Sequence, residues 1–273
     1  MSYAQNREDV RLYRAFPRDN GFYIDVGAAD PHEYSVTKSL SLRGWRGINL
    51  EPQPYYFDRL VADRPNDINL KLCVSERPGE ITFFESASHR GFSTADPKVA
   101  AEWSAKGISS QKVIVPTVTL AEICERYAPP TIDFLKVDVE GHERSVLLSA
   151  DFKRFRPVVL IIEATEQNNS TPNHHLWEDV VLKADYRFAA FDGLNRYYVR
   201  SEDAALAEVL AISPNIFDNY GPADVWNHVD ELKLEIQDLR RAIASLSASL
   251  AHAQNAASNS LAGRFRKLFQ RAA

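Results

Sequence analysis

The stretch FYIDVGAADP, residues 22–31, decides the fold. Strand-forming residues lead into Asp25, a turn begins at Gly27, and a second acid follows at Asp30. A strand that ends in Asp-x-Gly before a helix builds a nucleotide-sized crevice at the carboxyl edge of a parallel sheet. Asp25 or Asp30 can meet a cation there, and Gly27 lets the backbone come close. This acidity favours a cationic ligand such as S-adenosylmethionine, with its sulfonium and ammonium groups, over a pyrophosphate.

The composition is that of a globular protein. With 273 residues, 45% of them apolar and 25% charged, the chain has room for one α/β domain and an extension. The net charge of -5 argues against a nucleic-acid partner. Cys73 and Cys124 form no CxxC motif, and reduced, buried thiols are the simple interpretation. We find no signal peptide and no apolar run long enough to span a bilayer, so we expect a cytoplasmic protein.

Alternating strand and helix signals predict an α/β fold with helices on both faces of a sheet. A capping box at Thr119 and Glu122 opens one of these helices. Residues 186–191 and 196–199 flank a turn and predict a closing hairpin. A mostly parallel seven-stranded sheet that closes with a hairpin is the class I methyltransferase-like, or Rossmann-like, layout. Two further extended segments are expected at 81–84 and 113–118, and the main strands are expected at 22–26, 47–50, 68–74, 132–137 and 158–162.

An acid at the tip of the second strand, Glu51, can take both ribose hydroxyls of a bound nucleoside. Dehydrogenases and methyltransferases both use an acid there. The turn after the first strand separates the two classes, because Asp30, Pro31 and His32 replace the further glycines of a GxGxxG fingerprint. A nicotinamide oxidoreductase is therefore the weaker alternative.

Acids and histidines gather at the ends of the fourth and fifth strands. Asp138 and Glu163 end these strands, His142 follows the first, and His174 and His175 open a later helix. Adjacent strand ends of such a sheet point into one crevice, so we expect these side chains to converge. One histidine can act as the base that removes a hydroxyl proton. Alternatively, Asp138 and Glu163 can hold Mg²⁺ or Mn²⁺, although two carboxylates are a sparse shell for a hard metal and the metal-free route is favoured.

Five blocks in order resemble the FkbM family of methyltransferases over about residues 3–200. They are YAQNRED at 3–9, YIDVGA at 23–28, GWRGINLEP at 44–52, FLKVDVEGHE at 134–143 and IEAT at 162–165. The resemblance implies a class I methyltransferase fold and O-methylation with S-adenosylmethionine, often of sugars or glycolipids in polysaccharide biosynthesis.

The resemblance also implies roles for residues of this chain. Asp25, Gly27 and Ala28 would hold the methionine part of the cofactor, and Glu51 would hold the ribose. Val74 and Ser75 would lie near the adenine. The family often has Asn and Gly where this chain has Ala29 and Pro31, so Asp30 or the backbone would substitute in those contacts.

We therefore predict an O-methyltransferase that uses S-adenosylmethionine and acts on a hydroxyl of a sugar in a polysaccharide or glycolipid. The insertion at residues 86–110, with Arg90, Trp103 and Lys106, is a candidate cover for the acceptor. The alternative from another class is a non-catalytic nucleoside-binding scaffold protein of a glycan-assembly complex.

The chain beyond the methyltransferase domain, predicted at 1–220, has a different pattern. From Val229 to Ala257, apolar residues recur at alternating steps of three and four, which predicts a coiled-coil helix at 225–258. We expect a homodimer through this helix, with an amphipathic helix packed on its own domain as the alternative. The tail, 259–273, combines apolar residues at helical spacing with basic ones. This pattern is typical of a helix in a membrane interface and predicts peripheral contact with the cell membrane, with a frayed basic end as the alternative.

Overall fold

A seven-stranded sheet organises the first of the two units into which the chain divides, Met1–Tyr220 and Gly221–Ala273. The computed structural model describes residues 1–86, 93–166 and 169–270, with the backbone alone for 224, 227, 230, 255 and 257–270. The strand order is β10-β11-β9-β8-β1-β2-β3. The strands are β1 (Phe22–Val26), β2 (Arg46–Leu50), β3 (Ile68–Leu70), β8 (Phe134–Val137), β9 (Val159–Glu163), β10 (Tyr186–Phe191) and β11 (Asn195–Arg200).

The sheet is parallel from β3 to β9 and ends in an antiparallel hairpin. The strand β11 pairs antiparallel with both β9 and β10, so it is the reversed member of the sheet. Every residue of β8 and β9 is buried, as expected for inner strands of a parallel sheet covered on both faces. The predicted α/β class is confirmed, and the structure has the hairpin at its predicted place.

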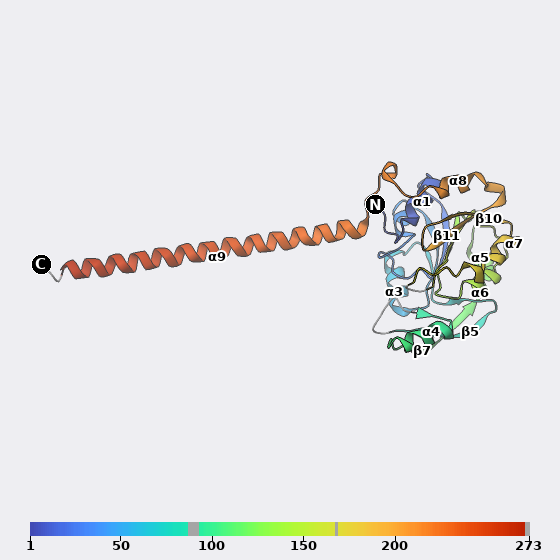
Figure 1. Ribbon diagram of the computed structural model, residues 1–273, viewed down its shortest axis with the longest axis horizontal. Helices are drawn as coiled ribbons and strands as arrows, with labels where there is room; N and C mark the ends of the chain where they lie inside the picture. Colours follow the sequence, from blue (N-terminus) through green and yellow to red (C-terminus); the bar gives the residue numbers. More distant parts are fainter. Residues whose placement is uncertain (87–92, 167–168, 271–273) are drawn as a thin grey trace. The chain divides into compact units, whose positions relative to one another are not determined.

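Helices cover both faces of this sheet (Figure 1). Because side chains alternate along a strand, Leu160 and Ile162 of β9 pack with α5, α6 and α7, whereas Val159 and Ile161 pack with α1, α2 and α8. The capping box of Thr119 and Glu122 forms as predicted at the start of α5. The helices are α1 (Glu8–Ala15), α2 (Lys38–Leu42), α3 (Pro54–Asp63), α5 (Leu120–Tyr127), α6 (Glu143–Leu148), α7 (Glu178–Lys183) and α8 (Ala205–Ala211), with short 3₁₀ turns at His174–Leu176, Ser201–Asp203 and Ile216–Asp218.

A second, four-stranded sheet corrects the predicted third strand at 68–74. The pairing of β3 with β2 ends at Leu70, where its carbonyl accepts the N–H of Glu51. After two more residues the chain pairs with Thr117 and Val118 instead. This sheet has the order β4-β7-β5-β6. Its strands are β4 (Cys73–Val74), β5 (Gly79–Glu85), β6 (Ser93–Thr94) and β7 (Gln111–Val118), and the helix α4 (Pro97–Ala105) connects β6 to β7.

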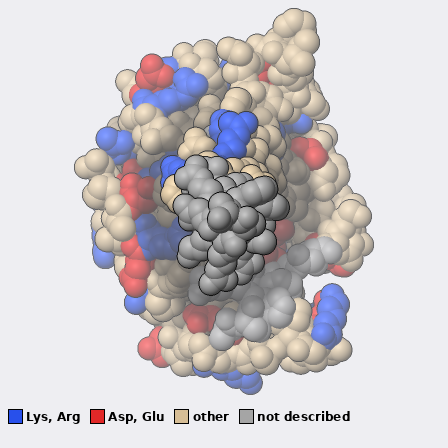
Figure 2. All heavy atoms as spheres, turned by 90° about the vertical axis from the view of Figure 1, so that its left-hand side faces the viewer, with Lys and Arg blue, Asp and Glu red and all other residues tan. Residues whose placement is uncertain are grey.

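The second unit is one helix, α9 (Ala223–Gln270), drawn in orange and red in Figure 1. Among the described residues, we find no helix with the length and hydropathy to span a bilayer. The side chains on which the membrane prediction for 259–273 depends lie outside the described ones, so it stays a prediction. On the face in Figure 2, acidic and basic side chains are interspersed rather than separated by sign.

Candidate cofactor and acceptor site

A cavity of about 140 Å³ opens where β1, β2 and β8 end. Gly27, Glu51 and Asp138, which follow these three strands, border it. Cys73 and Val74 of the second sheet border it as well. The predicted meeting of the strand ends at one crevice is therefore present in the structure.

The turn after β1 requires glycine at position 27. Gly27 has a positive φ of 80°, and a side chain there would place its Cβ 1.8 Å from the carbonyl oxygen of Asp138. Its N–H donates to the carbonyl of Leu50 over 3.0 Å. The turns after β1 and β8 thus come into direct contact, which brings the Asp138 end of the cavity close to the Gly27 end.

Glu51 closes the turns on either side of the cavity. Its carboxylate accepts the N–H of Ala29 over 2.9 Å and the N–H of Gln53 over 2.8 Å. Each carboxylate oxygen therefore keeps a lone pair for a further hydrogen bond. The side chain is buried, and burial raises the pKa of Glu51 to about 7, against the lowering effect of these backbone donors.

Lys136 is a residue of this site that the sequence reasoning missed. Its ammonium group lies 3.2 Å from Asp25, 3.4 Å from Asp138 and 3.0 Å from the carbonyl oxygen of Gly27, to which it donates. Burial lowers the pKa of Lys136, but the two carboxylates outweigh it and hold this pKa above the ordinary value. The sequence does contain a signal for this role: Lys136 is the one charged residue of an otherwise apolar strand, and Asp133 and Asp138 stand directly before and after that strand.

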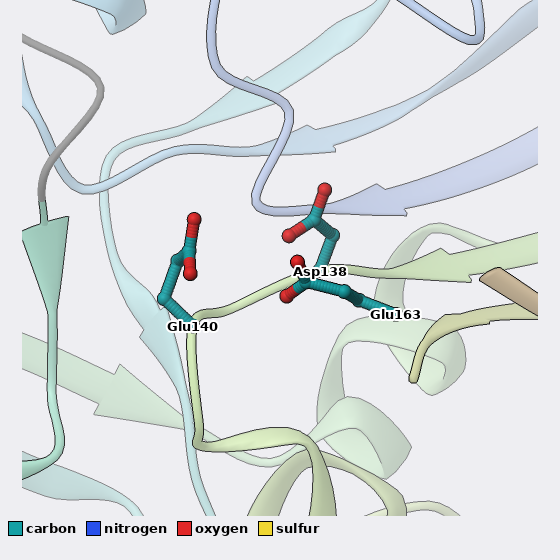
Figure 3. Close-up of side chains that lie close together, drawn as sticks. All are labelled: Asp138, Glu140 and Glu163. Carbon is teal, nitrogen blue, oxygen red and sulfur yellow. The ribbon is translucent and has the colours of Figure 1, made fainter. Parts of the chain in front are cut away.

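Three carboxylates gather at the ends of β8 and β9. Glu163 reaches from the end of β9 toward Asp138, and Glu140 stands on the loop after β8 (Figure 3). One oxygen from each of the three lies within 4.8 Å of the others. Glu163 is only 7% exposed, and burial, followed by the charges of Asp138 and Glu140, raises its pKa well above the ordinary value. Burial and the neighbouring acids therefore disfavour an unpaired negative charge on Glu163.

A second cavity, of about 390 Å³, shares Glu140 with the first. His175 and Asn173 border it, and so do Trp103 and Lys106 of the predicted acceptor cover. Arg90, the other residue of that prediction, lies outside the described residues. The Oδ1 atom of Asn173 is buried and has no hydrogen-bond partner within the described chain, while its Nδ2 donates to the carbonyl of Thr165 over 2.8 Å.

The three candidate histidines separate in the structure. His142 borders the first cavity, and its Nε2 is buried without a hydrogen-bond partner in the described ranges. Burial lowers the pKa of His142, against the charges of Asp96 and Glu76. His175 borders the second cavity. His174 is among the bordering residues of neither cavity and lies 4.0 Å from Glu178.

Four of the predicted cofactor residues do not border the first cavity. Asp25 is 1% exposed and forms the ion pair with Lys136. Asp30 caps its own turn by accepting the N–H groups of residues 32 and 33, and it pairs with Arg59 at 3.0 Å. Ala28 is buried. Ser75 follows β4, and its hydroxyl lies 3.3 Å from that of Ser145. The neighbour Ala29 borders the cavity in place of Ala28.

The reversed strand of the sheet and the acid that closes on the first turn are features of the S-adenosylmethionine-dependent methyltransferase class. The family model described as the methyltransferase FkbM domain matches residues 25–188. This match covers more than half of the chain, and the protein belongs to the FkbM methyltransferase family. The predicted family is therefore confirmed, and with it the general activity of methyl transfer from S-adenosylmethionine.

Comparison with curated proteins gives no match. Among solved structures, the chain is similar to a TehB-like SAM-dependent methyltransferase from Corynebacterium glutamicum, with 10% identity, 71% of this chain and 87% of that chain covered, and a TM-score of 0.38. A precorrin-6y C5,15-methyltransferase from Geobacter metallireducens has 12% identity, the same 71% and 87% coverage and a TM-score of 0.35. A fibrillarin/Nop5p complex has 15% identity, 67% and 74% coverage and a TM-score of 0.33. Similarities this weak do not contribute to the assignment.

Proposed function

We propose that this protein is an O-methyltransferase that acts on a hydroxyl of a sugar in a polysaccharide or glycolipid. The observation that carries the proposal is the junction of the two cavities at Glu140, beside Asp138. A methyl donor in the first cavity and a hydroxyl acceptor in the second would meet among carboxylates. Such alignment can by itself supply several kcal/mol of the barrier reduction.

The first cavity suits S-adenosylmethionine. When bound, this cofactor supplies a methyl group activated by its sulfonium charge. Glu51, with a lone pair left on each oxygen, is suited to the two ribose hydroxyls. The buried Nε2 of His142 lacks a partner among the described residues. Because burial favours the neutral imidazole, this atom is suited to a hydrogen bond with the adenine. We therefore propose that His142 binds the cofactor, rather than acting as the base that removes the hydroxyl proton.

The second cavity suits a hydroxyl-bearing acceptor. The Oδ1 of Asn173, which has no partner in the described part of the chain, can only accept a hydrogen bond, and a sugar hydroxyl can donate one. Leaving a buried acceptor unpaired costs about 1–3 kcal/mol, so a partner on the acceptor would contribute to its selection. Asp96, Glu102 and Lys106 at the border offer further hydrogen bonds to a polyol.

We assign the removal of the hydroxyl proton to His175, the histidine that borders the acceptor cavity. The other route is a divalent cation on Asp138, Glu140 and Glu163, which would lower the pKa of the hydroxyl itself. We favour His175 because it borders the acceptor cavity, whereas Asp138 and Glu163 are not among the described residues that line that cavity.

The test is transfer of labelled methyl from S-adenosylmethionine to a panel of nucleotide sugars, oligosaccharides and glycolipid vesicles. We expect label in a sugar ether, and a fall in turnover of about 100-fold or more for His175→Asn. His252→Asn, an exposed site on α9, is the matched control and should keep full turnover. Loss of activity in EDTA with recovery in Mg²⁺ would instead show that a cation, held by the three carboxylates, activates the acceptor hydroxyl.

One further outcome would favour the scaffold alternative. S-adenosylhomocysteine would bind in a calorimeter, but no hydroxyl acceptor of the panel would receive a methyl group. Label in a sugar amine or in a protein would instead contradict the acceptor class while leaving methyl transfer intact.

A further inference from the structure

The second unit carries an exposed apolar stripe along α9. In heptad terms, positions a are Val229, Ile236, Ile243 and Leu250, and positions d are Leu232, Leu239, Leu246 and Ala253. The six leucine and isoleucine side chains at these a and d positions are between 43% and 70% exposed. A long helix gains most of its stability by burying such a stripe, so the stripe needs a partner.

We propose that the partner is a second copy of this chain, joined through α9 in a parallel, in-register, two-stranded coiled coil. The stripe repeats every 3.5 residues, the period that keeps the seam of two supercoiled helices in contact. Val and Ile hold the first three a positions and Leu the first three d positions, the combination that favours two strands over three or four.

Charges beside the stripe favour the parallel register. Glu235 stands at position g and Arg240 at the e position of the next heptad. In a parallel dimer, Glu235 faces Arg240 of the partner subunit, and symmetry gives this pair twice. The next two g and e positions of the described helix hold only Ala242, Ser247, Ser249 and Gln254, which add no repulsion.

A membrane surface suits this part of α9 less well than a second copy. Between 231 and 241 the polar positions carry Glu231, Glu235 and Asp238 beside Lys233, Arg240 and Arg241. A helix that lies on an anionic bilayer instead has a polar face rich in Lys and Arg. The mixed charges here suit a solvated coiled coil.

The mass of the full chain in solution tests the association. By light scattering after size exclusion, we expect twice the chain mass for the wild type and the single mass for the double variant L239E/L246E. The matched control S245E/A248E places the same charges on outer positions and should remain dimeric. Thermal unfolding of the first unit should be the same in all three proteins. A monomeric wild type, or a dimeric L239E/L246E, would overturn the proposal.

Cysteine cross-linking tests the register. Leu246→Cys places one thiol on each strand at a facing d position, and mild oxidation should give a covalent dimer. Ala248→Cys, on the outer face, should not, and the buried Cys73 and Cys124 should leave the wild type uncross-linked. The single variant E235R should raise the dissociation constant about five-fold at low salt, and E235R/R240E should restore it. A dimer without the Leu246→Cys cross-link would overturn the parallel register, and a trimeric mass would overturn the stoichiometry.

Discussion

Replacing Lys136 by methionine removes a positive charge from the interior and nearly preserves the side-chain volume. Asp25, 1% exposed, would then keep one hydrogen-bond donor among the described residues, the hydroxyl of Thr37 at 3.4 Å. Breaking a buried ion pair by removing one partner costs about 3–5 kcal/mol, because the other charge stays buried. We expect a loss of that order in the free energy of unfolding at pH 8.

The loss should shrink as the pH falls. Without Lys136, the buried Asp25 carboxyl has its pKa raised further above the ordinary value than in the wild type, where Lys136 lowers it. A group whose folded pKa is raised contributes stability that is present at low pH and is lost as the pH rises through that pKa. The variant therefore approaches the wild type as the pH falls through the raised pKa of Asp25, because the protonated carboxyl carries no buried charge.

Urea unfolding of the full chain, followed by tryptophan fluorescence at pH 8 and pH 5, measures both effects. Lys153→Met, at an exposed site, is the control and should change the free energy of unfolding by less than about 0.5 kcal/mol. The double variant K136M/D25N should recover much of the loss, since no buried charge remains unpaired. If Lys136→Met matched the control at both pH values, the ion pair would have no structural role and the reasoning would be refuted.

Three more perturbations follow from the structure. Gly27→Ala places a Cβ 1.8 Å from the Asp138 carbonyl oxygen, so calorimetry should show about a 100-fold loss of S-adenosylhomocysteine affinity, and unchanged affinity would contradict the required close approach. Glu163→Gln should raise the melting temperature in EDTA at pH 8 but much less at pH 5. The reason is that the raised pKa of Glu163 destabilises the wild type only as the pH rises through that pKa and the buried carboxyl ionises. The opposite trend would mean that the fold stabilises the ionised form. Thr119→Ala should lower the free energy of unfolding by about 1 kcal/mol in urea, and no change would mean that the capping box adds nothing.

Much of the main sheet could be predicted because its inner strands are continuous apolar runs. Residues 22–26 were predicted at the observed bounds of β1, and the hairpin of β10 and β11 followed from two extended runs around a turn. The second sheet could not be assembled in the same way. Its strands β4 and β6 have two residues each, too short for any periodicity, and β4 pairs with a segment far along the chain.

The site was predictable at the level of strand ends but not of side chains. The order of a parallel sheet requires that Gly27, Glu51 and Asp138 meet at one edge, and they do. Which histidine borders which cavity depends on loop conformation, and no spacing in the sequence separates His142 from His175. The choice between a histidine base and a divalent cation therefore stays a prediction. The sugar acceptor, the cytoplasmic location and the lack of a nucleic-acid partner are also still predictions.

The acids that first indicated a cationic ligand are not the ones that face the cavity. Lys136 and Arg59 pair with Asp25 and Asp30, so neither acid is left to meet a sulfonium. Lys136 also pairs with Asp138, so a single positive charge is shared between two carboxylates at the ends of β1 and β8. The preference for a positive ligand therefore survives, but it is carried by Asp138 and Glu140 at the next strand. Asp25 acts one step away, by holding the lysine that fixes the carbonyl of the Gly27 turn.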